Sequence, residues 1–440
     1  MRVTWIQPED LIGHELRQAR EQGKDVDGVE ARWFQAGGAP APARGASSEA
    51  APPELRALSS TLLDEVARIP NPLGDDEPED YEAIVAAASG SVSLEPATGL
   101  ADRIGGAWLG RAIGCLLGKP VESIPREGIR AIAEGTGNWP VSSYFTAVGL
   151  DPAVGERWPW NKASRPTSLL ENINGMPEDD DLNFTMLTTL VLEQRGTSFS
   201  SLDVAKAWLD YLPAGRIFTA ERIALRNLLL GLLPPETATY QNPFREWIGA
   251  RLRVDAYGWA APGDPQRAAR MAWEDARVSH TANGVYAAMF MAAAHAASLA
   301  DVTPAAAADA GLGVVPAASR LAEAIRFARA QTGEWESILD ALYERYGSFH
   351  WVHAINNTAL VAAAMYRFTS FDEAIGAVVA GGWDTDTNGA AIGSIFGALA
   401  GAGGIDGRWS EPLHDTIASS LPGFDASSID GLARRTLAVA

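Results

Sequence analysis

Two segments of the sequence concentrate carboxylates just before predicted helices. They read MPEDDDLNFTML (176–187) and GGWDTDTNGAAIGS (381–394). One aspartate would be enough to cap each helix, since an anion at a helix N-terminus contributes about 0.5–2 kcal/mol. A run of acids alone is typical of a solvated, capped helix start. The second cluster favours a metal site over simple helix capping, because its aspartates alternate with the hydroxyl-bearing residues Thr385 and Thr387. Hard oxygen ligands in this pattern favour a site for Mg²⁺, Mn²⁺ or Ca²⁺.

Two common metal sites do not fit this sequence. An EF-hand loop that started at Asp384 would need a bidentate glutamate at its twelfth position, which is Ile395. The segment after Gly389 also has a helical pattern, where a calcium loop should continue. Zinc is disfavoured because the histidines form no HExxH pair and Cys115 is the single cysteine.

The elements that must position these carboxylates are predicted to be helices. From residue 97 onward, apolar residues recur at spacings of three and four, and alternating β-branched runs are scarce. We therefore predict an all-α domain over 97–440. Helical spacing recurs at 102–118, 183–194, 202–212, 220–231, 266–278, 284–300, 316–331, 335–346, 357–367, 372–380 and 389–402.

Two of these predicted helices carry glycine at every fourth position. The glycines are Gly106, Gly110, Gly114 and Gly118 in one helix, and Gly389, Gly393, Gly397 and Gly401 in the other. Each glycine costs a helix about 1 kcal/mol relative to alanine. A repeat on one face makes sense only where another backbone packs very close. The two helices are expected to pack on each other, or each to approach a ligand.

Residues 1–96 are predicted to be an N-terminal extension. One short helix is expected within 1–35, and an amphipathic helix is expected from Leu55 to Ile69, where Pro70 ends it. The Ala/Pro/Gly/Ser-rich stretch 36–53 has no large apolar residue and is predicted to be a disordered linker.

Charge and composition limit the function classes. The chain has 440 residues, 35 Lys+Arg and 55 Asp+Glu, which gives a formal charge of −20. This balance of charges argues against nucleic acid and against an anionic membrane as partners, although it allows one bound nucleotide.

With one cysteine no intrachain disulfide can form, which fits a reducing cytosol. No signal-like or membrane-spanning run is present, so a cytoplasmic location is expected.

Four motifs in order resemble the ADP-ribosylglycohydrolase family, which includes dinitrogenase reductase-activating glycohydrolase. They are GAWLGRAIGCLLGKPVE (106–122), EDDDLNFTM (178–186), RVSHTANG (277–284) and GGWDTDTNGAAIGS (381–394). The resemblance implies a compact multi-helix all-α domain with a dinuclear metal cleft. It implies two divalent cations, with Mg²⁺ first and Mn²⁺ second, at the base of that cleft.

The resemblance also assigns roles to individual residues. The implied metal ligands are Asp179, Asp180, Asp181, Asp384, Asp386 and Thr387. Glu122, Asp181 and Asp384 are the implied catalytic residues, and the sequence does not choose the proton acceptor among them. The implied substrate-binding residues are His280, Gly249 and Arg253. Trp383, whose ring near the acidic loops is suited to stacking on an adenine or another flat ring, and Asn388 complete the predicted substrate-binding set. A structural ion pair is the alternative for Arg253, and a buried core position is the alternative for His280.

Three positions depart from the family pattern. Cys115 stands where the family usually has aspartate, Asp179 stands where it has threonine, and Trp383 is inserted before Asp384. These changes indicate a subfamily with a different pocket.

The resemblance implies a metal-dependent hydrolase that cleaves a ribosyl N- or O-glycosidic bond. Its substrate would be an ADP-ribosylated protein, ADP-ribose or a nucleotide-like small molecule. Two alternatives stay open: an N-glycosidase for a nucleotide-derived specialised metabolite, and a non-catalytic ADP-ribose-binding or structural protein.

Overall fold

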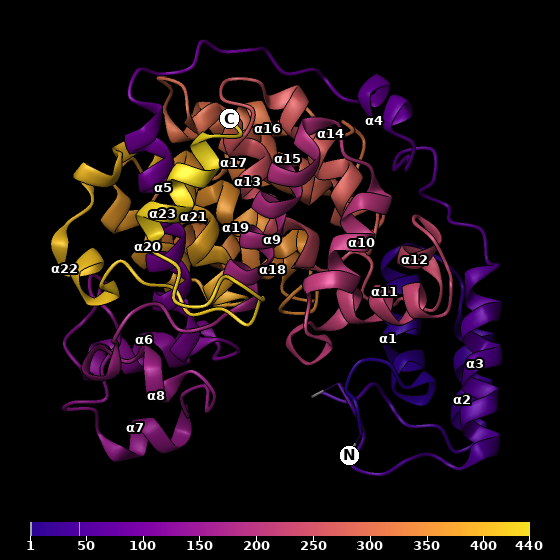
Figure 1. The fold of residues 1–440 in the computed structure, drawn as a ribbon. Coiled ribbons are helices and arrows are strands. Elements are labelled where there is room, and N and C mark those ends of the chain that lie inside the picture. The colour runs from indigo at the N-terminus through magenta and orange to yellow at the C-terminus, as the bar shows by residue number, and fades with distance from the viewer. Residues whose placement is uncertain (1, 44) are drawn as a thin grey trace.

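The computed structural model of the chain describes residues 2–43 and 45–440. Over these ranges the chain forms α-helices and short 3₁₀ helices, with isolated β-bridges but no β-strand. The all-α prediction is therefore confirmed. Figure 1 shows the helices packed around a core that includes α15 (Ala282–Ser298), in which every residue is buried.

Up to residue 276, the α-helices and the two 3₁₀ helices nearest the site are α1 (Pro8–Glu21), α2 (Asp27–Gln35), α3 (Pro53–Ala67), α4 (Tyr81–Ala87), α5 (Leu100–Gly118), η1 (Lys119–Val121), α6 (Arg126–Gly135), α7 (Pro152–Arg157), α8 (Arg165–Ser168), α9 (Asp180–Arg195), α10 (Ser201–Tyr211), α11 (Thr219–Leu229), α12 (Glu236–Thr239), η5 (Ile248–Arg253), α13 (Asp255–Trp259) and α14 (Pro265–Ala276). After α15 come α16 (Pro304–Leu312), α17 (Arg320–Ala330), α18 (Trp335–Tyr346), α19 (Ala354–Arg367), α20 (Phe371–Ala380), α21 (Thr385–Ala400), α22 (Gly407–Ser410) and α23 (Ile429–Leu437).

The two glycine-repeat helices, α5 and α21, pack directly on each other. A Cβ atom added at any of the facing glycines would collide with the carbonyl group of its partner. The facing pairs are Gly106 with Gly397, Gly110 with Gly393, and Gly114 with Gly389. The pairing is antiparallel, because residue numbers rise along one helix and fall along the other. The expectation that the glycines mark a close helix–helix contact is thus confirmed.

This contact brings two distant acidic segments together. It places the N-terminus of α21 against the C-terminus of α5, where the Thr385 hydroxyl donates a hydrogen bond to the Gly118 carbonyl at 2.8 Å. The helical course of α21 through Ile395 agrees with the exclusion of an EF-hand. From α5, the Arg111 guanidinium reaches α9 and donates to the Asp181 carbonyl at 2.7 Å. The α5 helix therefore links the two segments that carry carboxylates.

Residues 2–35 contain two helices, α1 and α2, where the sequence suggested one. The break lies at Gly23, which adopts a left-handed conformation with φ +75°. Together with α3 these helices form a second apolar cluster, which also includes Ile223 of α11 and the rings of Phe244 and Trp247. Figure 1 shows α1 next to α11, with α2 and α3 outside it. The N-terminal extension thus packs against the helical domain.

The segment predicted to be a disordered linker contains no helix within residues 36–43 and 45–52. Ala41 lies against Gly13 of α1, and Gly38 lies against the Trp33 ring. The Ser47 amide donates to the Asp10 carboxylate at 3.1 Å. Its flexibility and the domain boundary at residue 96 stay predictions.

In the part of the chain that the structure describes, none of the helices combines the length and apolar character that crossing a bilayer requires.

Candidate active site

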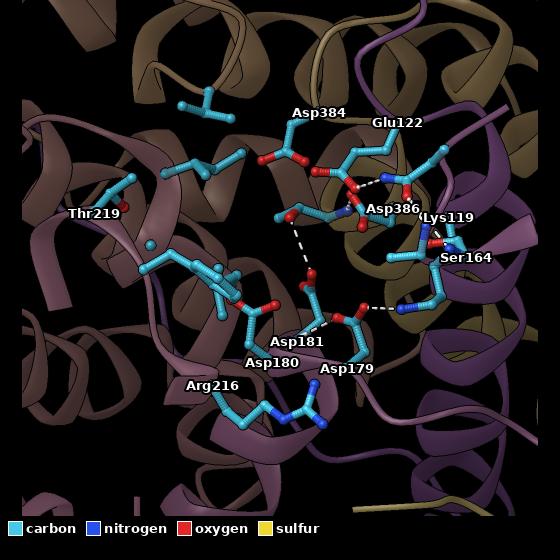
Figure 2. A pocket seen from close by; sticks show the side chains of 18 of the residues that line it. Lys119, Glu122, Ser164, Asp179, Asp180, Asp181, Arg216, Thr219, Asp384 and Asp386 are labelled. Carbon is cyan, nitrogen blue, oxygen red and sulfur yellow. Dashed lines mark hydrogen bonds and ion pairs between the residues drawn. The ribbon is translucent and has the colours of Figure 1, made fainter. Parts of the chain in front are cut away.

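A cavity of about 420 Å³ opens where η1, the N-terminus of α9 and the N-terminus of α21 meet. One part of its lining, here called the carboxylate wall, consists of Glu122, Asp179, Asp180, Asp181, Asp384 and Asp386. Figure 2 shows these side chains turned toward a common space. The predicted metal ligands therefore converge from two separate segments of the chain, and the predicted catalytic residue Glu122 joins them from a third.

One group of possible ligands comprises Glu122, Asp384 and Asp386. A carboxylate oxygen from each lies within 4.8 Å of the other two. Asn161 orients the Glu122 side chain by donating to its Oε2 atom at 2.8 Å. The backbone N–H of Asp384, just before α21, donates to the Asn357 Oδ1 atom at 3.2 Å. This spacing suits a hard cation that several oxygen atoms share.

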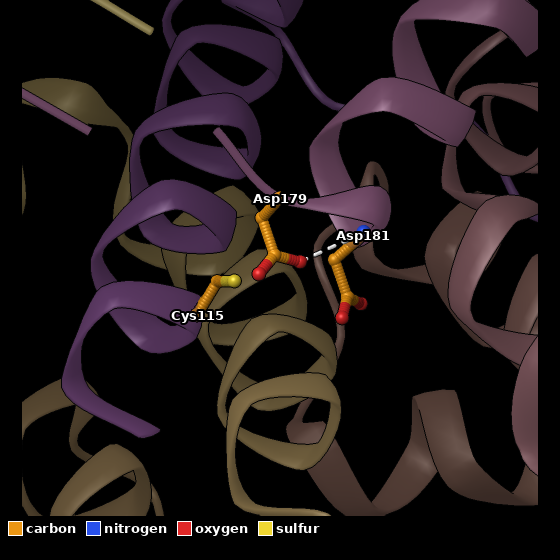
Figure 3. A group of neighbouring side chains, drawn as sticks. All are labelled: Cys115, Asp179 and Asp181. Carbon is orange, nitrogen blue, oxygen red and sulfur yellow. Dashed lines mark hydrogen bonds between the residues drawn. The ribbon is translucent and has the colours of Figure 1, made fainter. Parts of the chain in front are cut away.

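A second group comprises Cys115, Asp179 and Asp181, whose ligand atoms also lie within 4.8 Å of one another (Figure 3). Burial raises the pKa of the Cys115 thiol, and the neighbouring Asp179 and Asp181 carboxylates raise it further. The thiolate, not the thiol, is the metal-ligating form of cysteine. The second group therefore supplies two carboxylates and a protonated thiol, which makes it a poorer cation site than the first.

The two groups are connected through Thr387. Its hydroxyl donates to the Asp181 Oδ2 atom at 3.0 Å, and its backbone N–H donates to the Asp386 Oδ1 atom at 3.0 Å. The N-terminus of α21 thus touches the N-terminus of α9.

Burial raises the pKa of five carboxyl groups in this wall. It is the largest cause for Glu122, Asp180, Asp181, Asp384 and Asp386. Repulsion between neighbouring carboxylates adds to it at Glu122 and Asp384, where the Asp386 carboxylate contributes most after burial. The wall is therefore difficult to ionise without added positive charge.

Among the described residues, two cationic side chains form ion pairs with the carboxylate wall. Arg111 lies 3.2 Å from the Asp181 Oδ1 atom, and the Lys119 ammonium pairs with Asp179. Burial opposes the charge on Lys119, but the surrounding anionic groups, with Asp179 first, together outweigh burial and raise the pKa of the ammonium. Of six carboxylates, four have no such partner. This surplus of buried oxygen ligands fits divalent cations, which would neutralise it.

The structure encloses two of the predicted substrate-binding residues. Arg253 has no exposed surface and binds Glu221 at 2.7 Å as well as Asp275. His280 is 1% exposed and shares a hydrogen bond of 2.8 Å with the Ser279 hydroxyl through its Nδ1 atom. Neither residue lines the cavity. Glu221 does line the cavity, so Arg253 affects the site indirectly, by holding the Glu221 carboxylate in place.

Trp383 and Asn388 also lie outside the lining of the cavity. The Trp383 ring stacks on Tyr343 with centroids 4.3 Å apart. Asn388 is buried and accepts a hydrogen bond from Arg251 at 2.5 Å. Gly249 does line the cavity, and a Cβ atom there would collide with the Glu221 carboxylate.

Several lining residues carry chemistry that the sequence did not single out. These are Lys119, Asn161 and Arg216, together with the aromatic side chains described below. The sequence did contain a signal for Lys119, because it is one of only four lysines in the chain and lies in the motif GAWLGRAIGCLLGKPVE (106–122). The sequence contained no such signal for Arg216 or Asn161, since no local pattern connects them with the acidic segments.

Sequence similarity to known proteins identifies the family of this chain. The family model described as ADP-ribosylglycohydrolase matches residues 96–440. A solved structure titled "ADP-ribosylglycohydrolase-related protein complex" is 23% identical, covers 77% of this chain and 97% of its own, and superposes with a TM-score of 0.46. A comparison with curated proteins gives no match. Since the family model spans most of the sequence and includes the whole carboxylate wall, the chain belongs to the ADP-ribosylglycohydrolase family of glycosyl hydrolases.

Proposed function

We propose that this chain hydrolyses a ribosyl N- or O-glycosidic bond of an ADP-ribosylated protein, of ADP-ribose or of a nucleotide-like small molecule. The observation that carries the proposal is the convergence of six carboxylates on one wall of a cavity, where four of them form no ion pair with a cation from residues 2–43 and 45–440. A glycosidic bond breaks through an oxocarbenium-like transition state, which neighbouring carboxylates stabilise.

Two divalent cations, Mg²⁺ in the first place and Mn²⁺ as the alternative, would be held by Asp180, Asp181, Asp384, Asp386 and Thr387. When bound, such ions supply Lewis acidity toward a water molecule and a ribose diol. Asp179 is less available as a ligand because Lys119 already pairs with it.

Glu122 is the best candidate for the residue that holds and moves a proton. Its Oε2 atom accepts a hydrogen bond from Asn161, and the carboxylate faces the cavity. Both oxygen atoms of Asp181 are already engaged, one by Arg111 and the other by Thr387. A carboxylate oxygen of Asp384 lies within 4.8 Å of one from Asp386, in the first group of possible ligands. We therefore assign the proton to Glu122 and leave Asp181 and Asp384 as ligands.

Arg216 is the candidate for binding the phosphate groups of the substrate. It lines the cavity, and its side chain is 61% exposed and 3.4 Å from the Glu178 carboxylate. An exposed guanidinium beside an acidic wall can bind a diphosphate that the wall alone would repel.

One observation favours an N-glycosidase for a small metabolite as the second candidate. The Lys119–Asp179 ion pair lies in the cavity lining and involves Asp179, one of the three positions that depart from the family pattern. For either substrate, a reducing cytosol is our proposal for the location.

The proposed function is tested by measuring release of free ADP-ribose from ADP-ribosylated peptides and from small ADP-ribosides. We expect turnover with Mg²⁺ or Mn²⁺ and its loss in EDTA. Asp386→Asn should lower kcat by about 100-fold or more and remove stabilisation by the ion. Asp75→Asn, which changes an exposed aspartate outside the cavity, is the matched control. Full activity of Asp386→Asn would exclude the proposal.

A further inference from the structure

A second part of the cavity lining is aromatic. This aromatic wall consists of Trp5, Phe218, Trp247, His350 and Trp351. The Trp247 and His350 rings stack with centroids 4.2 Å apart and planes 13° from parallel. Trp5 meets Trp247 edge to face at 6.1 Å. One cavity thus combines carboxylates, which suit a sugar with its cations, and flat ring faces, which suit another flat ring.

Trp5 belongs to the N-terminal extension, outside the residues that the family model matches. Its backbone N–H donates to the Gly45 carbonyl at 2.6 Å, and Arg222 of α11 donates to the Thr4 carbonyl at 3.2 Å. The backbone of Trp5 is left-handed, with φ +65°, which is uncommon for a residue with a large side chain. Its surroundings therefore hold this ring at the cavity against an unfavourable local preference.

The extension itself is anchored by buried polar contacts. Glu15 of α1 binds Arg245 at 2.7 Å, and Gln18 of α1 donates to Glu246 at 2.9 Å. Arg245 and Glu246 immediately precede Trp247 in the aromatic wall. The docking of α1 and the position of the stacked rings are thus coupled through neighbouring residues.

We propose that Trp5, together with Trp247 and His350, forms a subsite that binds the nucleobase ring of the substrate. The proposal rests on the proposed function, because it assumes that the ribose lies at the carboxylate wall. It makes the N-terminal extension a determinant of specificity. Stacking of a base on an aromatic side chain is a substantial and sequence-tolerant contact. The cavity volume also falls in the range that is usual for ligand pockets.

The test compares two ligands on the full-length chain in the presence of Mg²⁺. ADP-ribose carries a base and ribose 5-phosphate does not. Calorimetry on wild type, Trp5→Ala and Trp5→Phe should show ADP-ribose binding weakened about tenfold by Trp5→Ala and largely restored in Trp5→Phe. Ribose 5-phosphate should bind all three within about twofold, because it makes no ring contact. With an ADP-ribosyl substrate, Trp5→Ala should raise KM and leave kcat unchanged.

Phe34→Ala is the matched control, because Phe34 is an aromatic residue of the same extension that is 45% exposed and does not line the cavity. Unchanged ADP-ribose binding in Trp5→Ala would overturn the subsite alone. Equal weakening of both ligands, or a fall in kcat with KM unchanged, would assign Trp5 a structural role and overturn it too. If wild type binds neither ligand and releases no ADP-ribose, the proposed function fails, and the subsite falls with it.

Discussion

The carboxylate wall and the aromatic wall share one cavity but are held by different kinds of contact. The carboxylate wall depends on α5 and α21, whose backbones touch at facing glycines. The aromatic wall depends on side chains: ring stacking, the Glu15–Arg245 ion pair and the packing of α1. Backbone contact allows almost no change of residue, whereas contacts between side chains respond gradually to substitution.

Within one pocket, the carboxylate wall would therefore serve the reaction, and the aromatic wall would serve substrate specificity. The parts that would hold cations and a ribose lie at the N-termini of α9 and α21, which α5 links, inside the matched region, residues 96–440. The part that would bind the rest of the substrate draws on an extension outside it. Substitutions in the aromatic wall can therefore alter substrate choice while the carboxylate wall keeps its geometry.

The largest expected effect comes from breaking the backbone contact. Gly114→Val would place a branched side chain against the Gly389 carbonyl, and the α5–α21 pair cannot close around it. Overpacking usually costs about 1–3 kcal/mol, and a clash with backbone should exceed that range or prevent folding. Thermal and urea unfolding measure the effect.

Gly105→Ala on the same helix is its control. The added Cβ atom would meet only the Ala402 Cβ atom at 3.4 Å, which is close to ordinary contact. Stability should be unchanged or raised by up to about 1 kcal/mol, because alanine favours helix. A Gly114→Val variant as stable as Gly105→Ala would contradict the claim that backbone contact fixes the carboxylate wall.

A smaller effect should follow from removing the ammonium that neutralises part of this wall. Lys119→Ala leaves the buried Asp179 carboxylate without its partner. Loss of one member of a buried pair costs about 3 kcal/mol or more, although exposure to the cavity reduces this. Added Mg²⁺ should recover more stability in the variant than in wild type. Equal thermal shifts in both proteins would mean that Lys119 does not neutralise the site.

The smallest expected effect concerns the aromatic wall and pH. Burial lowers the pKa of His350 to about 3, and Arg17 and His14 add to the shift; burial likewise lowers the pKa of His14 to about 4. In the unfolded chain both histidines bind protons below about pH 6.5, while in the folded chain they stay neutral. Stability is therefore full above pH 6.5 and falls as the pH drops toward 4.

At pH 5 each of the two histidines should cost roughly 2 kcal/mol of unfolding free energy relative to pH 7. His350→Phe keeps a flat ring and removes one proton site, so its stability should fall less between pH 7 and pH 5 than that of wild type. Parallel pH profiles of the two proteins would show that His350 does not set this dependence.

Local patterns were enough to predict much of the carboxylate wall. Asp384 and Asp386 follow a double glycine at the start of a predicted helix, and the glycine repeats predicted the contact that places them. Helical periodicity is a property of neighbouring residues, so it can be read without a structure. Arg253 and His280 show the limit of this approach. Motif position suggested that they face the substrate, but only packing decides whether a polar side chain reaches a cavity or another buried group.

The sequence by itself determined the helical class, the two glycine-repeat helices and the two acidic segments, because each depends on residues a few positions apart. The tertiary structure alone decided that Lys119 pairs with Asp179 and that Trp5 lines the same cavity as Asp384. These contacts join residues that are tens to hundreds of positions apart in the chain. Their formation depends on which surfaces the whole fold buries together, and no local spacing encodes that choice.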